Sequence, residues 1–288
     1  WRSSPAAARV LAVAARIREI ASDHDEARPL AEAALAMADE LGLDEIRAHA
    51  LTTIGMAKNS LGDTSGTADM ERARALALEI ESSVAGPIVN NLAVEAFMHG
   101  DLPRAEELYA ESIRISLRLG DRESAAFTNA NLVWMAFFRG NWDAAYQAAD
   151  EFIAACEAGA PNLTEYAMRI IRGGIRLARG DLDGARDDHL RSVELARAGQ
   201  DPNDIVAALS AYASTLLARG ELTEARVFAE EVVRLVEGRA FGGAVELSAN
   251  ALRLGIREEM LAALDANPVQ RYVVWREGIR MALAGDLV

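Results

Sequence analysis

The chain has 288 residues and a formal charge of -14, and 51% of its residues are hydrophobic. That apolar content excludes a disordered chain, and the acidic charge argues against binding to nucleic acid or to an anionic membrane surface. The single cysteine, Cys156, excludes a disulfide framework, and no apolar stretch approaches the roughly 18 residues that span a bilayer, so we expect a cytoplasmic protein.

The sequence repeats itself with a period of about 40 residues. A glycine followed by an acidic or amide residue returns five times, at spacings of 38, 40, 40 and 40 residues. These turn glycines are Gly62, Gly100, Gly140, Gly180 and Gly220. A second set lies about half a period away, at Gly42, Gly120, Gly159, Gly199 and Gly238. Because glycine ends a helix by adopting the left-handed conformation without a Cβ clash, both sets predict helix ends.

In chain order, this pattern predicts six helix hairpins and an incomplete remainder. The hairpins span residues 5–42, 44–82, 85–120, 122–159, 162–199 and 202–238. We therefore divide the chain into six hairpins in residues 1–241 and a segment of residues 242–288 that holds a degenerate hairpin and a terminal helix. That helix, at 268–284, would be a C-terminal cap or a truncated repeat. The chain also begins without a methionine, so we expect it to be part of a longer protein.

Local signals mark the start of the second helix in several hairpins. In the first hairpin Ser22 and Asp23 replace the turn glycine, and Asp23 is expected to cap the helix that follows. The same role is expected for Asp101, Asn141 and Asp181, which directly follow turn glycines.

Small residues recur where the two helices of a hairpin would cross. Five residues after a turn glycine stands an alanine, at Ala105, Ala145, Ala185 and Ala225. Seven residues before it stands another small residue, at Gly55, Ala93, Val133, Gly173 and Ala213. Because small side chains let two helix backbones approach, we expect the two sets to face each other.

This combination of a small residue in the first helix, a turn glycine and an alanine in the second helix resembles the tetratricopeptide repeat. Segments such as Asn90-Asn91-Leu92-Ala93 and Arg118-Leu119-Gly120-Asp121-Arg122 are similar to its longer, 40-residue variety. The resemblance covers roughly residues 5–238. It implies an all-α fold, a right-handed α-solenoid of tetratricopeptide-like helix hairpins whose first helices line a concave face. The 40-residue variety resembles the helical arms of bacterial signal-transduction ATPases, maltose-regulator-like transcription activators and multidomain nucleotide cyclases.

The chain lacks the residue patterns of an active site or a metal site. Its four histidines, His24, His49, His99 and His189, have no second histidine or cysteine at metal-ligand spacing. No phosphate loop, dinucleotide fingerprint or nucleophile elbow occurs. We therefore expect no catalytic residues, no metal and no cofactor, and a protein that is not an enzyme.

Asparagines and aromatic residues gather on the predicted inner helices. The candidate groove residues are Asn59, Asn90, Asn91, Phe97, Asn131, Trp134 and Phe138. By resemblance to other repeats of this type, Asn91 and Asn131 would pair with the backbone of an extended peptide, since an amide offers both a donor and an acceptor. The alternative is that the asparagines link neighbouring helices and the aromatic side chains fill the core.

A row of four arginines is the one concentrated positive charge of this acidic sequence. The row consists of Arg169, Arg172, Arg176 and Arg179. Spacings of 3, 4 and 3 residues place it on one face of a first helix, where it could clamp a carboxylate, a phosphate or an acidic peptide. The alternative is pairing with acids such as Glu151, Asp187 or Asp188. If the row binds an anion, replacing Arg172 and Arg176 by alanine should weaken that binding and leave the melting temperature within a few degrees. If the row is structural, the same replacement should lower the melting temperature strongly.

Together these features predict a non-catalytic scaffold or regulatory sensor arm of a larger bacterial signalling or transcription-regulating protein. A protein or peptide partner would lie in the concave groove, and catalytic or DNA-binding domains would be attached in the parent chain. The alternative is a small-molecule effector receptor with an arginine-lined pocket near Arg172 and Trp134. We expect no direct contact with nucleic acid or membrane. The half-finished hairpin at 268–288 is the candidate contact for a homodimer.

Overall fold

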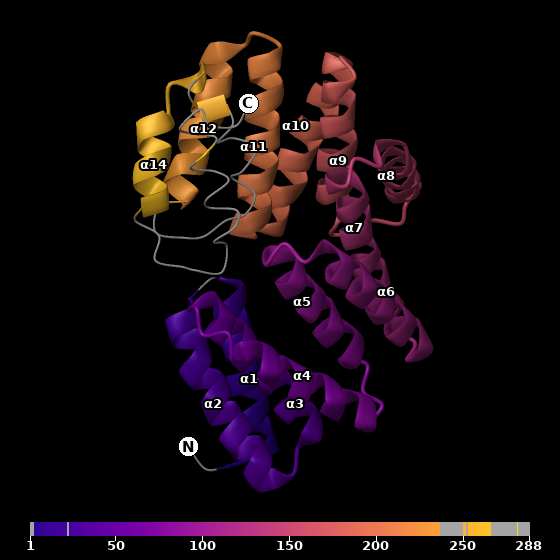
Figure 1. The fold of residues 1–288 in the computed structure, drawn as a ribbon, viewed down its shortest axis with the longest axis vertical. Helices are drawn as coiled ribbons and strands as arrows, with labels where there is room; N and C mark the ends of the chain where they lie inside the picture. Colours follow the sequence, from indigo (N-terminus) through magenta and orange to yellow (C-terminus); the bar gives the residue numbers. More distant parts are fainter. Residues whose placement is uncertain (1–2, 22, 237–249, 252, 266–280, 282–288) are drawn as a thin grey trace. The chain divides into compact units, whose positions relative to one another are not determined.

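A computed structural model describes residues 3–21, 23–236, 250–251, 253–265 and 281 of the chain (Figure 1). Every regular element in these ranges is an α-helix, so the predicted all-α fold class is confirmed. None of these helices combines the length and the hydropathy that a membrane-spanning helix requires. The chain forms two compact units, and the boundary between residues 132 and 133 falls within one helix.

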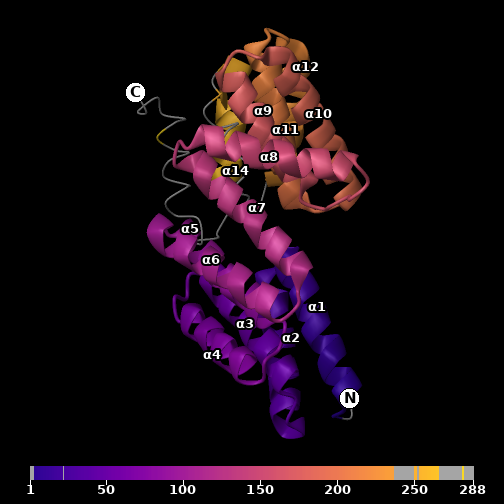
Figure 2. The same cartoon turned by 90° about the vertical axis from the view of Figure 1, so that its right-hand side faces the viewer.

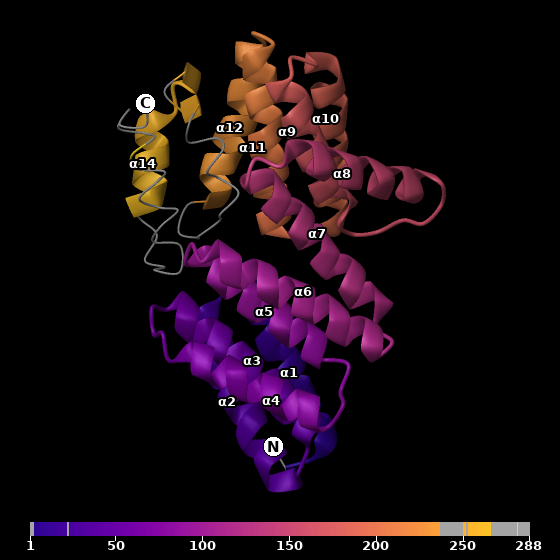
Figure 3. The ribbon, with the colours of Figure 1, turned by 45° about the vertical axis from the view of Figure 1, so that its right-hand side comes forward.

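The first unit contains three helix hairpins. Its helices are α1 (Pro5–Ile20), α2 (His24–Leu41), α3 (Asp44–Ser60), α4 (Gly66–Glu79), α5 (Ala85–Met98) and α6 (Leu102–Arg118). Helix α1 packs on α2, α3 on α4, and α5 on α6, while α2 on α3 and α4 on α5 join successive hairpins (Figure 3). The first helices of the first two hairpins, α1 and α3, also touch each other directly.

The second unit, taken by itself, also contains paired helices. Helix α7 (Arg122–Phe138) crosses the boundary, and α8 (Trp142–Glu157), α9 (Glu165–Ala178), α10 (Leu182–Gly199), α11 (Pro202–Ala218), α12 (Leu222–Val236) and α14 (Arg257–Asp265) follow. The helices α9 to α12 stack side by side in sequence order (Figure 1), and Figure 2 shows the same helices turned by 90°. First helices α9 and α11 are in contact, and one core cluster extends from α9 to α14 within this unit.

The predicted helix ends agree with the structure in most places. Each of the six predicted hairpin ranges contains two helices, and all five turn glycines have φ between 78° and 86°. Gly199 differs, because α10 continues through it and Gln200 takes the left-handed conformation instead, with φ 61°. Gly238 and the predicted terminal helix at 268–284 lie outside the described residues. The division at residue 241 therefore stays a prediction.

Two of the four predicted helix caps are confirmed. The carboxylate of Asp101 accepts a hydrogen bond from the backbone N–H of Arg104, and Asp181 accepts one from Gly184. The prediction was wrong for Asn141 and Asp23, whose side chains make no capping bond. The carboxylate of Asp23 instead accepts a hydrogen bond from Arg18 at 3.3 Å.

Small residues do occupy the helix crossings, although one pairing differs from the prediction. The alanines at 105, 145, 185 and 225 are all at most 1% exposed. A Cβ added at Gly173, however, would lie 2.4 Å from the ring of His189, which stands one helical turn beyond Ala185. His189 is 1% exposed, and its ring bonds Thr215 Oγ1 at 2.7 Å and the Ile170 carbonyl at 3.1 Å. Gly173 thus makes room for a buried, hydrogen-bonded ring.

Candidate functional site

The arginine row on α9 converges on one buried carboxylate of α10. Arg172 donates two hydrogen bonds to Asp188, from Nε to Oδ2 at 2.9 Å and from Nη2 to Oδ1 at 2.6 Å. Arg176 donates from Nη1 to Oδ2 at 2.8 Å, and Arg169 from Nη1 to Oδ1 at 3.4 Å. Because the Asp188 side chain is only 2% exposed, three guanidinium groups share one carboxylate away from water.

Three further carboxylates balance the charge of the row. Arg169 pairs with Glu165 at 2.7 Å and with Glu157 at 2.8 Å, and Arg172 pairs with Asp150 at 2.7 Å. The side chains of Arg169 and Arg172 are 9% and 11% exposed, so most of each guanidinium group is enclosed by its partners. We refer to these ion pairs around Asp188 as the α9–α10 ion network.

The ion network favours the structural reading of the arginine row. Burial alone would lower the pKa of Arg172, but the hydrogen bonds and negative charge of Asp188 outweigh it and raise the pKa. An external anion would have to displace carboxylates that already saturate Arg169 and Arg172. Of the three acids named from the sequence, Asp188 does pair with the row. Among the described residues, neither Glu151 nor Asp187 does, and the further partners of Arg169 and Arg172 are acids of α8 and α9.

The last arginine of the row is more exposed and bridges two repeats. Arg179 pairs with Asp143 of α8 and lies over the ring of Tyr146, 5.6 Å from its centroid. One period later, Arg219 pairs in the same way with Asp183 of α10. The arginine before the turn glycine thus connects its own hairpin to the preceding one in both repeats.

Three of the predicted groove asparagines form hydrogen bonds between neighbouring first helices. Nδ2 of Asn59 on α3 donates to Glu95 on α5 at 3.0 Å, and Nδ2 of Asn131 on α7 donates to Oδ1 of Asn90 on α5 at 2.9 Å. Asn59 and Asn90 are 6% and 5% exposed. These three amides therefore serve the helix-linking role that the sequence left open as an alternative.

Asn91 differs from these three. It is half-buried on α5, and its side chain forms no hydrogen bond with any residue in the described part of the chain. Of the two asparagines to which resemblance assigned peptide binding, Asn91 therefore keeps a free amide, whereas that of Asn131 is engaged.

Aromatic side chains gather where α7 ends and α8 begins. The rings of Trp134 and Phe138 are stacked, with centroids 5.5 Å apart and an interplanar angle of 21°. Phe137 meets Trp134 edge-on at 5.9 Å and stacks on Trp142 at 6.4 Å. Phe138 and Trp142 remain 47% and 40% exposed. We call these four residues the aromatic cluster.

The aromatic cluster is held in place from two sides. The indole Nε1 of Trp142 donates to the carbonyl oxygen of Phe137 at 3.2 Å, and Trp134 packs against the core of the second unit. A Cβ added at Gly174 of α9 would lie 3.6 Å from the Phe137 ring, so the backbone of α9 lies close to that ring. Phe97, also predicted for the groove, is half-buried on α5 of the first unit.

Sequence reasoning missed some residues that the structure shows to be central. Trp142 follows the turn residue Asn141 and was not assigned to the groove, although its place in the period puts it beside the end of α7. Tyr166 on α9 donates a hydrogen bond to Asp204 on α11. Burial raises the pKa of Asp204 to about 6. Nothing in the local sequence distinguishes Asp204 from the many solvated acids of the chain.

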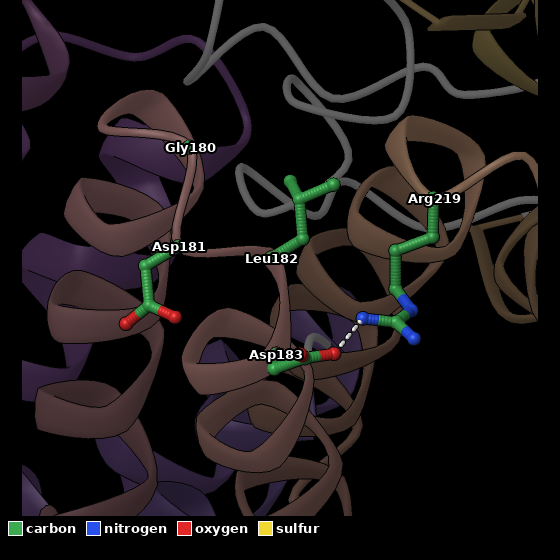
Figure 4. Close-up of a pocket in the computed structure, with 5 residues that line it drawn as sticks. All are labelled: Gly180, Asp181, Leu182, Asp183 and Arg219. Carbon is green, nitrogen blue, oxygen red and sulfur yellow. Dashed lines mark hydrogen bonds and ion pairs between the residues drawn. The ribbon is translucent and has the colours of Figure 1, made fainter.

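A surface depression of about 400 Å³ lies at the turn between α9 and α10. It is lined by Gly180, Asp181, Leu182, Asp183 and Arg219 (Figure 4). Its one cation is neutralised, because Arg219 pairs with Asp183 across the depression and with Glu221 at 2.6 Å. Within the described ranges, no three His, Cys, Asp or Glu side chains are grouped so that they could hold a metal ion.

No family model and no curated protein matches this sequence. The fold is similar to that of NprR, solved in complex with its cognate peptide NprX, at 12% identity over 97% of this chain and 86% of that chain, with a TM-score of 0.66. It is also similar to a Rap protein complexed with Competence and Sporulation Factor, at 12% identity over 96% and 79% of the two chains, with a TM-score of 0.61. A tetratricopeptide repeat protein from Parabacteroides merdae matches at 14% identity over 96% and 99%, with a TM-score of 0.51.

These similarities show the fold, a helical repeat of the tetratricopeptide type, as predicted from the turn glycines and alanines.

Proposed function

We propose that this chain is a non-catalytic scaffold or regulatory sensor arm that binds a peptide or protein segment through the aromatic cluster. The observation that carries the proposal is the half-exposure of Phe138 and Trp142 within a cluster whose other rings are packed. Large aromatic side chains held partly in water are typical of the centres of protein interfaces.

The geometry of the cluster suits recognition of an apolar or aromatic side chain. Stacking between Trp134 and Phe138 and support from Gly174 limit the ring rotamers before a partner arrives. Because less side-chain entropy is then lost on binding, more of the buried apolar area contributes to affinity. Separately, the free amide of Asn91 in the first unit would pair with a peptide bond of a segment bound to that unit.

The similar structures support a binding role, since NprR was solved in complex with its cognate peptide NprX and the Rap protein in complex with Competence and Sporulation Factor. As in the arms that the sequence resembles, we place the chain in the cytoplasm of a bacterium, attached to a catalytic or DNA-binding domain whose activity it regulates. Binding would then shift the population between two arrangements of the parent protein. The proposed dimer contact at 268–288 lies outside the described residues.

The small-molecule alternative receives less support. It requires free guanidinium groups near Arg172, and the ion network already pairs Arg169 and Arg172 with carboxylates inside the fold.

Selection from a display library of random twelve-residue peptides would test the proposal. Peptides enriched on the wild-type chain are measured again on a Phe138→Ser variant by fluorescence anisotropy. Because removal of a central aromatic anchor costs at least about tenfold in affinity, binding should weaken by that factor or more. Phe127→Ser is the matched control, since Phe127 lies on the same helix and is 51% exposed.

The proposal fails if enriched peptides bind both variants equally well, or if no peptide is enriched over an unrelated helical-repeat protein. Thermal unfolding of both variants shows whether each is folded.

A further inference from the structure

The solvent-facing side of α1 is both apolar and basic. Val10, Val13, Ile17 and Ile20 are 55%, 52%, 60% and 49% exposed, at helical spacings of 3, 4 and 3 residues. The single acidic residue of α1 is Glu19, which is buried and bonds His24 Nδ1 at 2.9 Å. In a chain of charge -14, a helix face without any exposed acid is unusual, and its exposed apolar side chains are typical of a binding surface.

A groove between α1 and α3 continues this face. It encloses about 190 Å³ and is lined by Arg9, Ala12, Val13, Arg16, Glu45, Ile46, His49 and Thr53. Both helices contribute apolar side chains to its lining, Ala12 and Val13 from α1 and Ile46 from α3. The groove belongs entirely to the first unit.

The two arginines at the rim have no acidic partner within the described part of the chain. Among the described residues, neither Arg9 nor Arg16 forms an ion pair, although both are exposed beside the groove. Neighbouring arginines are engaged: Arg18 pairs with two carboxylates, and Arg47 pairs with two others. The lone acid of the lining, Glu45, can balance only part of the charge of the two arginines and His49.

We propose that the groove between α1 and α3 binds an acidic segment of a partner protein, in which two carboxylates flank an apolar side chain. Like the proposed function, it assumes that the chain binds polypeptide, but it concerns a different surface and can fail separately. The apolar side chain would cover Val13 and Ile46, and the carboxylates would pair with Arg9 and Arg16.

The spacing of the two arginines fits such a segment. Seven residues along a helix separate them by about 10.5 Å. In an extended peptide, side chains four residues apart lie on the same face about 13 Å from each other. The flexible arginine side chains cover the difference, so residues one and five of the segment would be acidic and residue three apolar. Arginine can bind each carboxylate with two parallel hydrogen bonds.

His49 adds a response to pH. Burial lowers its pKa, and so does the positive charge of Arg16 and, more weakly, that of Arg9, whereas Glu45 raises it. The imidazole is therefore neutral near pH 7.5 in the free protein. Carboxylates bound beside it would favour the protonated ring, so binding should tighten as the pH falls toward 5.5.

A membrane surface is the rival partner for a basic, apolar helix face. Two observations favour a peptide. The binding surface is a concave groove formed by two helices, and the chain as a whole carries a charge of -14, which an anionic bilayer repels.

The experiment uses the full chain and a fluorescein-labelled peptide. Its five central residues are glutamate, serine, leucine, serine and glutamate, and two glycines flank them on each side. A matched peptide carries glutamine in place of glutamate. Anisotropy titrations are run on the wild type, on Arg9→Gln with Arg16→Gln, and on Arg18→Gln with Arg28→Gln. The last variant loses the same charge from exposed arginines that are already paired within α1 and α2 or the turn between them.

We expect saturable binding of the glutamate peptide, a loss of at least about tenfold in the groove variant, and a change of less than about twofold in the charge-matched control. The glutamine peptide should bind weakly to all three proteins. Between pH 7.5 and 5.5 the wild type should gain affinity, and a His49→Gln variant should not.

Equal losses in both arginine variants would show a diffuse charge effect and overturn the proposal. Cosedimentation with phosphatidylserine vesicles that depends on Arg9 and Arg16, without peptide binding, would overturn it in favour of a membrane. Self-association abolished by the groove variant, again without peptide binding, would assign the groove to a second copy. A Phe138→Ser variant should bind the glutamate peptide normally, which separates this outcome from that of the aromatic cluster.

Discussion

Replacing Asp188 by asparagine tests whether the arginine row is part of the fold. The change keeps the size of the side chain and one carbonyl acceptor, but it removes the negative charge on which Arg169, Arg172 and Arg176 converge. It also turns an amide N–H₂ group toward guanidinium donors that need an acceptor.

The structure allows the size of the effect to be worked out. Removing one partner of a buried ion pair typically costs about 3–5 kcal/mol, because the remaining charge stays buried without compensation. Here Arg169 keeps Glu165 and Glu157, and Arg172 keeps Asp150, so each retains a counter-charge. We therefore expect the lower end of that range, about 3 kcal/mol in the free energy of unfolding.

Urea unfolding followed by circular dichroism measures the change, and hydrogen exchange in α9 and α10 localises it, because repeats can unfold separately. The control is Asp187→Asn, one residue away, where an exposed carboxylate without an ion-pair partner in the described chain should change stability by less than about 0.5 kcal/mol. The difference should persist in 1 M salt, since buried pairs are screened little.

Equal stability of Asp188→Asn and Asp187→Asn would refute the reasoning, and so would unchanged exchange rates in α9. The double replacement of Arg172 and Arg176 by alanine is a second test of whether the α9–α10 ion network stabilises the fold. It leaves Asp188 only the 3.4 Å contact with Arg169, so the melting temperature should fall on the order of 10 °C.

Two further predictions concern single positions. Gly173→Ala should destabilise the protein by about 1–3 kcal/mol, since its Cβ would lie 2.4 Å from the His189 ring, whereas Gly174→Ala, which meets Phe137 at 3.6 Å, should be neutral or stabilising in the same thermal melts. Burial raises the pKa of Asp204 to about 6, above its unfolded value near 4, so its ionisation removes stability as the pH rises from 4 to 6. Asp204→Asn should therefore be more stable than the wild type at pH 7.5, by up to about 3 kcal/mol, and equal to it below pH 4; a constant difference across that range would contradict the assignment.

Much of the fold could be predicted from the sequence because its signals are local. A glycine such as Gly140 ends a helix through its own backbone conformation, and Asp181 caps α10 through a bond to a residue three positions away. The capping prediction failed at Asp23, where Arg18 of the preceding helix binds the carboxylate instead. That competition depends on how the chain turns between the helices.

The candidate site was less predictable. The sequence included Trp134 and Phe138 among the candidate groove residues, but it left open whether they fill the core, and it overlooked Trp142. Periodicity places a side chain on a helix face, and it does not say how much of that side chain the next repeat covers. The same limit hid the groove of Arg9 and Arg16, because an arginine without a partner is distinguished only by what surrounds it.

The sequence by itself determined the repeat and its helix ends, since these depend on interactions within about one helical turn. It also placed the small residues near the crossings by their period, but it did not determine which side chain each one meets across the hairpin. Only the tertiary structure decided which polar side chains form hydrogen bonds and ion pairs within the molecule. Arg172 meets Asp188 sixteen residues away, and Asn131 meets Asn90 forty-one residues away. Such partners are chosen by the faces that two helices present to each other, and a rotation of one helix by a single residue, about 100°, would choose others.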